Sequence, residues 1–224
     1  MAHCIHFARK IARWLLPLAG CWCVPLSAAE LQVRVMTPDG NPVEHAVVEI
    51  LTQPPGPTPS GSPANAIMDQ INKEFVGPVL AVAAGTLVEF PNSDDVHHHV
   101  YSFSDAKRFE LPLYTGNIAA PVLFDTPGVV TLGCNIHDWM VGYIYVAGSS
   151  RFGLTDANGM VVLVDINPGE HRLTIWHNSL PAGQALPEHA VSVSATGTTG
   201  MELTLETRTL RTIRRAPLPG TRAY

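Results

Sequence analysis

The residues best suited to chemistry lie in one short segment, residues 133–140. Within it Cys134, His137 and Met140 place a thiolate, an imidazole and a thioether at positions i, i+3 and i+6. Six residue steps of extended chain would span roughly 20 Å, which is far more than the separation between ligands of one metal ion. We therefore expect this segment to form a tight loop. A thiolate combined with a thioether favours copper, because zinc sites use Cys, His and carboxylate ligands.

Copper bound in this way needs a second imidazole to complete a trigonal plane. The nearby supply is the triplet His97, His98 and His99, which follows a turn-forming run at 91–95 and precedes an apolar run at 100–103. Successive residues of a strand face opposite ways, so neighbouring histidines of the triplet are not expected to bind the same ion. The spacing alone leaves open which of them is the ligand.

The two motifs, in this order, resemble the cupredoxins, the family of type 1 blue copper proteins. The Cys-x2-His-x2-Met loop has the short spacing of amicyanin, and cupredoxins carry an Asn six residues before the first ligand His, as Asn92 and His98 do here. The strings HHVYSFS and GCNIHDWMVGYIYV are similar to a subgroup known as methylamine-utilisation proteins. The resemblance covers residues 66–148 and implies one Cu ion, cycling between Cu(I) and Cu(II). The implied ligands are His98, Cys134, His137 and, as the weak axial ligand, Met140.

The chain departs from the cupredoxin pattern beside the first His. Cupredoxins commonly have Pro before this His and Asn after it, and that Asn helps to tether the Cys loop by hydrogen bonds. Here His97 and His99 occupy the two positions, and Ile136 stands where the loop often has Pro. His99 is therefore kept as the alternative first ligand, and the usual supporting Asn is absent. Trp139 is expected either to pack beneath the loop or to join an apolar docking face around His137.

The segments around these motifs read as β-strands. Short apolar runs with period-two alternation, bounded by Gly, Pro, Asn and Asp, recur along the chain, and no long apolar repeat has helical spacing. The predicted fold class is therefore all-β. The ligand loop should join two strands, and the copper unit should contain the following apolar runs: 79–82, 87–90, 100–103, 122–124, 129–132 and 141–146.

Two segments on either side of the copper unit resemble a second known fold, the carboxypeptidase-regulatory, transthyretin-like sandwich. Its pattern has a GxPVxxAxVxI hairpin, which begins here at Gly40, and a later Thr-Asp to Trp stretch, here residues 155–176. The resemblance implies a Greek-key cupredoxin β-sandwich inserted into a second, small β-sandwich. The expected boundaries are a first hairpin at 30–53, a Pro/Gly/Ser-rich linker at 54–65, the cupredoxin domain at 66–148 and the remainder of the second sandwich at 149–206.

The first 29 residues have the pattern of a secretory signal peptide. Arg9, Lys10 and Arg13 precede an apolar run that closes on Ser-Ala-Ala, with cleavage expected after Ala29 and a periplasmic location. The run is only about 13 residues long and is broken by two prolines, so no stable membrane span is expected. A lipid anchor at Cys21 is the alternative, because the four residues ending there resemble a lipoprotein processing box. Soluble export is favoured, since few apolar residues separate Arg13 from that cysteine.

Export would leave Cys134 as the single cysteine, which rules out an intramolecular disulfide. A lone thiol in an oxidising compartment is a liability unless it is buried or bound to a metal. Residues 30–206 carry six basic and 19 acidic residues, a net charge of −13 with histidine neutral, which disfavours nucleic acid as a partner. Residues 207–224 carry five arginines and are expected to form a disordered basic tail.

The favoured function is a periplasmic one-electron carrier that is not an enzyme, with redox protein partners docking near His137. A copper chaperone or sensor, which would bind Cu(I) with the same donors and release it, is the alternative. An enzymatic copper site would need a further metal cluster. The remaining histidines lack spaced partners and are expected to be structural or on the surface: His45, His171, His177 and His189.

Overall fold

The computed structural model describes residues 29–51, 64–116, 119–181 and 183–207. Within these residues every regular element is a β-strand, which confirms the all-β prediction. In chain order the strands are β1 (Ala29–Met36), β2 (Val47–Ile50), β3 (Asn65–Ile67), β4 (Gln70–Ile71), β5 (Glu74–Phe75), β6 (Val79–Ala83), β7 (Thr86–Glu89), β8 (His98–Ser104), β9 (Lys107–Tyr114), β10 (Val122–Phe124), β11 (Gly128–Gly133), β12 (Val141–Ala147), β13 (Phe152–Leu154), β14 (Met160–Ile166), β15 (Gly169–Trp176), β16 (Glu188–Val193) and β17 (Thr198–Thr204).

Some predicted segments lie outside the described residues. They are the signal peptide except for Ala29, with Cys21 inside it, most of the 54–65 linker, and the basic tail beyond residue 207. Ala29 itself, the last residue of the predicted signal segment, begins β1 and is buried. Within the described part of the chain, no helix has the length and apolar character needed to cross a bilayer.

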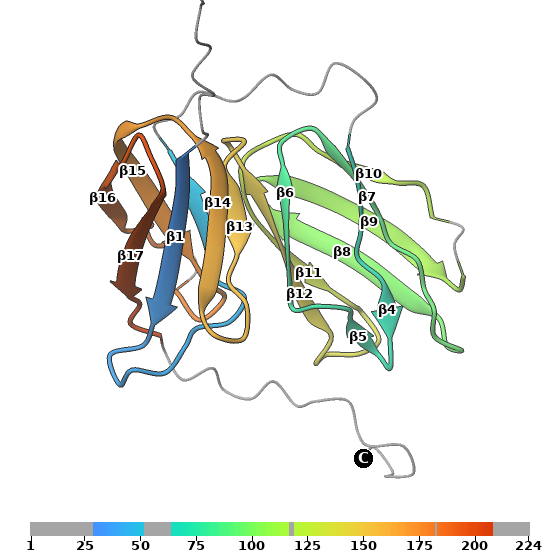
Figure 1. Ribbon diagram of the computed structural model, residues 1–224. Helices are drawn as coiled ribbons and strands as arrows, with labels where there is room; N and C mark the ends of the chain where they lie inside the picture. Colours follow the sequence, from blue (N-terminus) through green and yellow to red (C-terminus); the bar gives the residue numbers. More distant parts are fainter. Residues whose placement is uncertain (1–28, 52–63, 117–118, 182, 208–224) are drawn as a thin grey trace, which may run out of the picture.

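One sandwich, called here the flanking sandwich, is built from strands at both ends of the described chain. Its two sheets have the strand orders β14-β1-β17 and β13-β2-β15-β16. In β1 the side chains of Leu31, Val33 and Val35 are buried and alternate with exposed Gln32 and Arg34, so one face of the strand supplies the core. Strands that precede residue 64 and strands that follow residue 148 therefore pair with one another (Figure 1).

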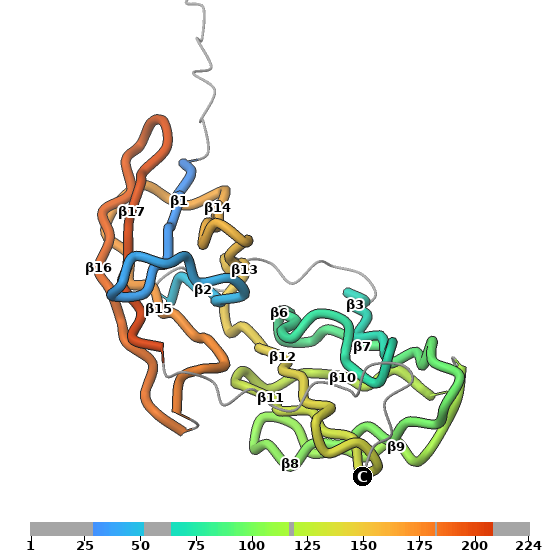
Figure 2. The backbone as a smooth tube through the Cα atoms, turned by 90° about the horizontal axis from the view of Figure 1, so that it is seen from below, coloured from blue at the N-terminus to red at the C-terminus, as the bar shows by residue number. Residues whose placement is uncertain are grey.

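The other sandwich, called here the central sandwich, contains the motif residues. A five-stranded sheet of order β6-β12-β11-β8-β9 faces a three-stranded sheet of order β10-β7-β3, and β4 and β5 form a separate hairpin. Val88 and Phe124 of the smaller sheet pack against Leu132 and Ile144 of the larger one in a single apolar core. Figure 2 shows this sandwich beside the flanking one, with β6, β12 and β13 near the junction.

A third apolar cluster lies where the two sandwiches meet. Val47 and Trp176 of the flanking sandwich pack with Val79, Tyr145 and Ala147 of the central one. The transthyretin-like identity of the flanking sandwich and the Greek-key description of the central one stay predictions. The larger sheet of the central sandwich carries the residues of the candidate site.

Candidate metal centre

The ligand loop joins two paired strands, as the sequence predicts. Strands β11 and β12 are antiparallel neighbours, and their last pair before the loop is Gly133 with Val141. Cys134 and Met140 therefore begin and end the loop side by side. Within the loop the amide of Met140 donates a hydrogen bond to the carbonyl of His137 at 2.9 Å. This turn brings the middle of the loop back towards its two ends.

Three of the predicted ligands come together at one point. The donor atoms of His98, Cys134 and His137 all lie within 4.8 Å of one another. Nδ1 of His98 lies 3.8 Å from Sγ of Cys134, and Nδ1 of His137 lies 3.6 Å from the same sulfur. The fourth predicted ligand, Met140, is 1% exposed and belongs to the same apolar cluster as Cys134, which is 4% exposed.

The geometry distinguishes the three histidines of the triplet. His98 opens β8, is fully buried and faces Cys134. His99, the alternative first ligand, points to the other face of the strand, where its Nε2 lies 2.8 Å from the carboxylate of Glu110 on β9. His97 is exposed. The opposite orientation of successive strand residues thus assigns different surroundings to His98 and His99.

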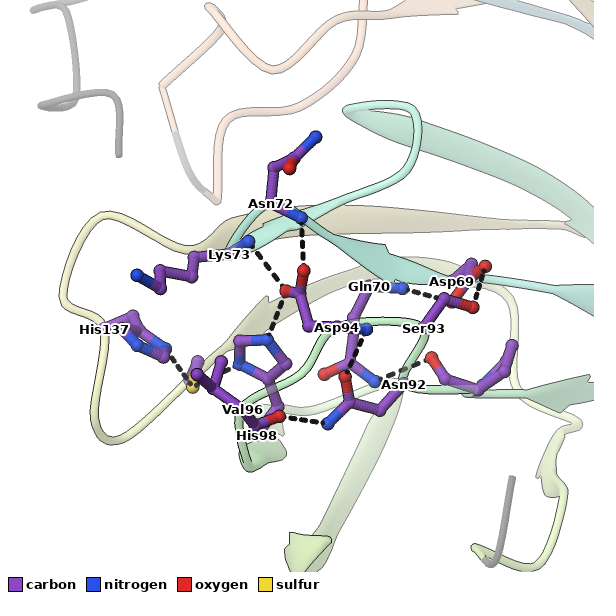
Figure 3. Close-up of polar contacts among 12 residues, drawn as sticks. Asp69, Gln70, Asn72, Lys73, Asn92, Ser93, Asp94, Val96, His98 and His137 are labelled. Atoms are coloured by element: carbon purple, nitrogen blue, oxygen red, sulfur yellow. Dashed lines mark hydrogen bonds and ion pairs between the residues drawn. The ribbon is translucent and has the colours of Figure 1, made fainter. Parts of the chain in front are cut away.

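The second ring nitrogen of His98 is held by a carboxylate that no sequence motif indicates. Nε2 of His98 lies 2.7 Å from Oδ2 of Asp94. Asp94 also accepts hydrogen bonds from the amides of Asn72 at 2.6 Å and Lys73 at 2.8 Å (Figure 3). Burial opposes ionisation of Asp94, but the bonds from His98 and the two amides prevail and lower its pKa. An ionised Asp94 accepts a hydrogen bond from Nε2–H of His98, which leaves Nδ1 unprotonated and free to act as a ligand.

The two amides belong to the turn of the β4–β5 hairpin. Asn72 and Lys73 have φ values of 58° and 61°, so both lie in the left-handed region. Two-residue hairpin turns use this conformation, with Gly usual at the second position. Lys73 stands there instead, at a cost of about 1–2 kcal/mol. The carbonyl of Lys73 accepts a hydrogen bond of 3.2 Å from Nε1 of Trp139, a residue of the ligand loop.

His137 is the partly exposed member of the cluster. Its ring centroid lies 5.3 Å from that of Trp139 and 4.9 Å from that of His98. Burial lowers the pKa of His137, and the neighbouring His98 and Lys73 lower it further, while Asp94 opposes them. At neutral pH the imidazole is therefore uncharged and can offer Nδ1 to a metal ion. Trp139 packs against His137 as part of the loop.

Asn92, which located His98 in the sequence, shapes the segment that leads into β8. Its buried side chain donates hydrogen bonds of 2.8 Å to the carbonyls of Val96 and Tyr114. Its Oδ1 accepts a bond of 3.0 Å from the amide of Asp94. Asn92 thereby fixes the turn that carries Asp94 and delivers His98 to the start of the strand.

The donor chemistry fits a copper ion. A thiolate, two imidazole Nδ1 atoms and a buried thioether provide two soft sulfur donors and two nitrogen donors, the combination that favours copper over zinc or harder cations. The shell around them is the apolar core of the central sandwich, which limits access of water. Among the described residues this is the one cluster of three metal-ligating side chains of the His, Cys and carboxylate types.

No protein-family model matches the chain, and no curated protein matches it. Solved structures match part of it. A Cu-containing nitrite reductase from Thermus scotoductus SA-01 is 25% identical, with 38% of this chain and 22% of that chain covered and a TM-score of 0.35. A purple cupredoxin from Nitrosopumilus maritimus is 26% identical over 38% of this chain and 99% of that chain, with a TM-score of 0.33. A reduced Cu(I) form of an amicyanin mutant is 20% identical over 45% of this chain and 98% of that chain, with a TM-score of 0.34.

Proposed function

We propose that the chain is a periplasmic type 1 copper protein that carries single electrons between redox partners. One observation supports this most directly: two imidazole Nδ1 atoms face the sulfur of Cys134 at 3.8 and 3.6 Å inside an apolar core. The residues that would hold the ion are His98, Cys134, His137 and Met140. When bound, copper supplies a one-electron couple between Cu(I) and Cu(II).

The surroundings of the ligands favour electron transfer without rearrangement. The ligand loop is closed at both ends by the pairing of β11 with β12, and His98 begins a strand of the same sheet. Side chains packed in a β-sandwich core have few alternative positions. A site held in this way would change little between the two oxidation states of copper.

Burial supports a carrier over a chaperone or sensor. A protein that hands copper to a partner needs ligands that the partner can reach, whereas His98 and Cys134 are enclosed. His137 is the partly exposed ligand, and Ile136 beside it is exposed. We propose that redox protein partners dock at this edge and that His137 is the point where the electron enters and leaves.

Addition of Cu(II) to the purified mature protein tests the copper assignment. An intense visible absorption band and an electron paramagnetic resonance spectrum of type 1 copper are expected in the wild type, and both should disappear in Cys134→Ser. A colourless copper complex would contradict the type 1 assignment.

Cyclic voltammetry of the copper-loaded protein tests the carrier role. Reversible one-electron cycling without loss of copper is expected. Rapid loss of Cu(I) to a chelator, without such cycling, would favour the chaperone or sensor. Because the matched nitrite reductase is an enzyme, the same sample should also be assayed with nitrite, where no turnover is expected.

The proposed location depends on the predicted signal peptide, residues 1–29. Fractionation of cells that produce the full chain should place the processed protein in the periplasmic extract. Incorporation of radiolabelled palmitate would instead indicate a lipid anchor at Cys21.

A further inference from the structure

Residues outside the ligand set contact both of the segments that carry the two histidines. We infer that Asp94, Trp139 and the Asn72–Lys73 turn form a brace that positions both histidine ligands. This inference rests on the proposed copper site. Asp94 and Trp139 are positioning residues, because they act through His98 and the ligand loop.

The first arm of the brace holds His98. Oδ2 of Asp94 lies 2.7 Å from Nε2 of His98 and also accepts the amide of Lys73 at 2.8 Å. Oδ1 accepts the amide of Asn72 at 2.6 Å. Asp94 therefore lies between the imidazole and the turn, as Figure 3 shows, and connects them through three hydrogen bonds. A carboxylate that orients a ligand histidine in this way fixes both its tautomer and its ring plane.

The second arm holds the ligand loop. Nε1 of Trp139 donates to the carbonyl of Lys73 at 3.2 Å, and the Trp139 ring lies against His137 with centroids 5.3 Å apart. Trp139 also immediately precedes Met140. The amide of Lys73 thus bonds to Asp94, the partner of His98, and the carbonyl of Lys73 bonds to Trp139, whose ring lies against His137.

The turn that joins the two arms is itself anchored. At the base of the hairpin, Phe75 packs so closely on Gly142 of β12 that a Cβ atom at that glycine would lie 2.9 Å from the ring. On the other side, the carbonyl of Gln70 accepts a hydrogen bond of 3.0 Å from the amide of Ser93. The hairpin is therefore fixed both to the strand that follows the ligand loop and to the segment that carries Asp94.

The backbone of the turn indicates that its position is held by these contacts. Asn72 and Lys73 both occupy the left-handed region, and neither is glycine. Such conformations persist where the surroundings over-determine them. Here the two amides converge on one carboxylate, and the carbonyl of Lys73 has its own partner in Trp139. The unfavourable turn at Asn72 and Lys73 is thus maintained at the point where it contacts both Asp94 and the ligand loop.

Two variants test the brace in the full mature chain. Asp94→Ala removes the first arm, and Trp139→Phe removes the indole donor while keeping an aromatic ring against His137. Each should weaken Cu(II) binding about 10- to 100-fold in competition with a chelator, the range usual for loss of a residue that supports a metal ligand. Each should also alter the copper hyperfine splitting. Asp95→Ala removes an exposed neighbouring carboxylate and the same negative charge as Asp94→Ala. It should leave both the Cu(II) affinity and the hyperfine splitting unchanged.

The double variant distinguishes one connected brace from two independent contacts. If the arms act through the same turn, Asp94→Ala and Trp139→Phe together should weaken Cu(II) binding by clearly less than the product of their separate factors. Independent, multiplicative effects would contradict the brace. So would an Asp94→Ala variant that binds Cu(II) as tightly as Asp95→Ala.

Measurements on the copper-free protein separate this inference from the proposed function. Amide hydrogen exchange at Asn72 and Lys73 should be slow in the wild type and should accelerate at least 10-fold in Asp94→Ala. Exchange that is already fast in the wild type would overturn the brace whatever the metal result. A protected turn in a protein that gives no type 1 copper spectrum would instead contradict the proposed function and leave the brace in place.

Discussion

The two imidazoles of the site are oriented by different means although both present Nδ1 to the same sulfur. His98 is buried and is held through its second nitrogen by Asp94. His137 is partly exposed and is held by packing against Trp139. The buried imidazole of His98 therefore depends on a hydrogen bond to a carboxylate, whereas the partly exposed imidazole of His137 depends on the conformation of the loop.

Met140 offers the sharpest residue-scale test of the axial position. In Met140→Gln we expect the blue colour to remain and the reduction potential to fall, because an amide oxygen is a harder donor than a thioether and stabilises Cu(II) over Cu(I). Cyclic voltammetry of the copper-loaded variant measures the change. Met201→Gln, a change in the flanking sandwich, should leave the potential at the wild-type value. A higher potential in Met140→Gln would show that the axial role is wrong.

The donor residues of the candidate site could be predicted from the sequence, but the residues that hold them in position could not. Cys134, His137 and Met140 stand out because three donor types recur at a fixed spacing, and Asn92 pointed to His98 through a family pattern. Asp94 looked like an ordinary turn residue, since its partners Asn72 and Lys73 lie more than twenty positions away. A contact between distant backbone amides and a single carboxylate leaves no periodic pattern in the sequence.

At the scale of elements, strands with an apolar run or a clear alternation were predictable, including the three-residue β10, whereas β4, β5 and β9 were not. Alternation in β1 and the apolar runs of β11 and β12 identify them directly. Strands β4 and β5 have two residues each, too few to show a period, and their turn lacks glycine. Strand β9 is an edge strand with mostly exposed or partly exposed residues, and Pro112 lies beside its register shift against β8.

The packing of β5 on β12 predicts that a larger residue at Gly142 destabilises the fold. Gly142→Ala would place a methyl group 2.9 Å from Cδ2 and 3.0 Å from Cγ of Phe75, and these atoms lie too near the backbone to swing away. We expect the variant to lose about 1–3 kcal/mol in the free energy of unfolding, as over-packed cores do. Urea denaturation of the copper-free protein measures this loss.

A matched control exists in the flanking sandwich. Gly200 of β17 has no atom within 4 Å of an added Cβ, so Gly200→Ala should leave the stability nearly unchanged. In a Phe75→Ala background, which lacks Cγ and Cδ2, Gly142→Ala should cost less than it does in the wild type. Equal stability of Gly142→Ala and Gly200→Ala would contradict the close packing.

His177, in the loop that follows β15, should make the stability of the protein depend on pH. Nδ1 of His177 accepts a hydrogen bond from the amide of Ser179 at 3.2 Å. Burial lowers the pKa of His177 below its ordinary value of 6.5, and nearby His45 adds to this effect, while a hydrogen bond to the backbone of Glu44 opposes it. The unfolded chain therefore takes up the proton first. The stability contributed by neutral His177 is complete above pH 6.5 and is lost progressively as the pH falls below it.

Urea midpoints measured between about pH 7.5 and pH 5.5 test this sign. The midpoint of the wild type should fall with decreasing pH more steeply than that of His177→Gln, which cannot take up the proton. The comparison cancels the contribution of His137, since both proteins retain it. Parallel curves would show that His177 does not titrate differently in the folded and unfolded states.

At the scale of the whole molecule, the junction of the two sandwiches combines an apolar cluster with one buried polar contact. Trp176 of the flanking sandwich lies against the rings of Tyr143 and Tyr145 in the central one. Beside them the carboxylate of Glu49 accepts hydrogen bonds of 2.7 Å from the hydroxyl of Tyr145 and from the amide of Ser149. Burial and the adjacent Glu49 raise the pKa of Tyr145, so its hydroxyl keeps the proton that it donates. Strand β12 thereby connects the ligand loop at one end with the flanking sandwich at the other.

This polar contact should link the folding of the two sandwiches. Tyr145→Phe keeps the ring against Trp176 but leaves one oxygen of a buried carboxylate without its hydroxyl donor, at a cost of about 1.5–3 kcal/mol in the free energy of unfolding. Tyr143→Phe makes the same chemical change two residues earlier, beside the same tryptophan, and should cost much less.

Urea denaturation, followed by Trp fluorescence and by the visible absorption of bound copper, compares the two variants. In the wild type the two signals should change together. In Tyr145→Phe the part of the fluorescence change that comes from Trp176 should occur at lower urea than the loss of the copper band, because the contact is lost at the junction and not at the ligands. The part that comes from Trp139, in the ligand loop, should follow the copper band. Coincident transitions with an unchanged midpoint would mean that Glu49 gains nothing from Tyr145 and that the apolar cluster alone joins the two sandwiches.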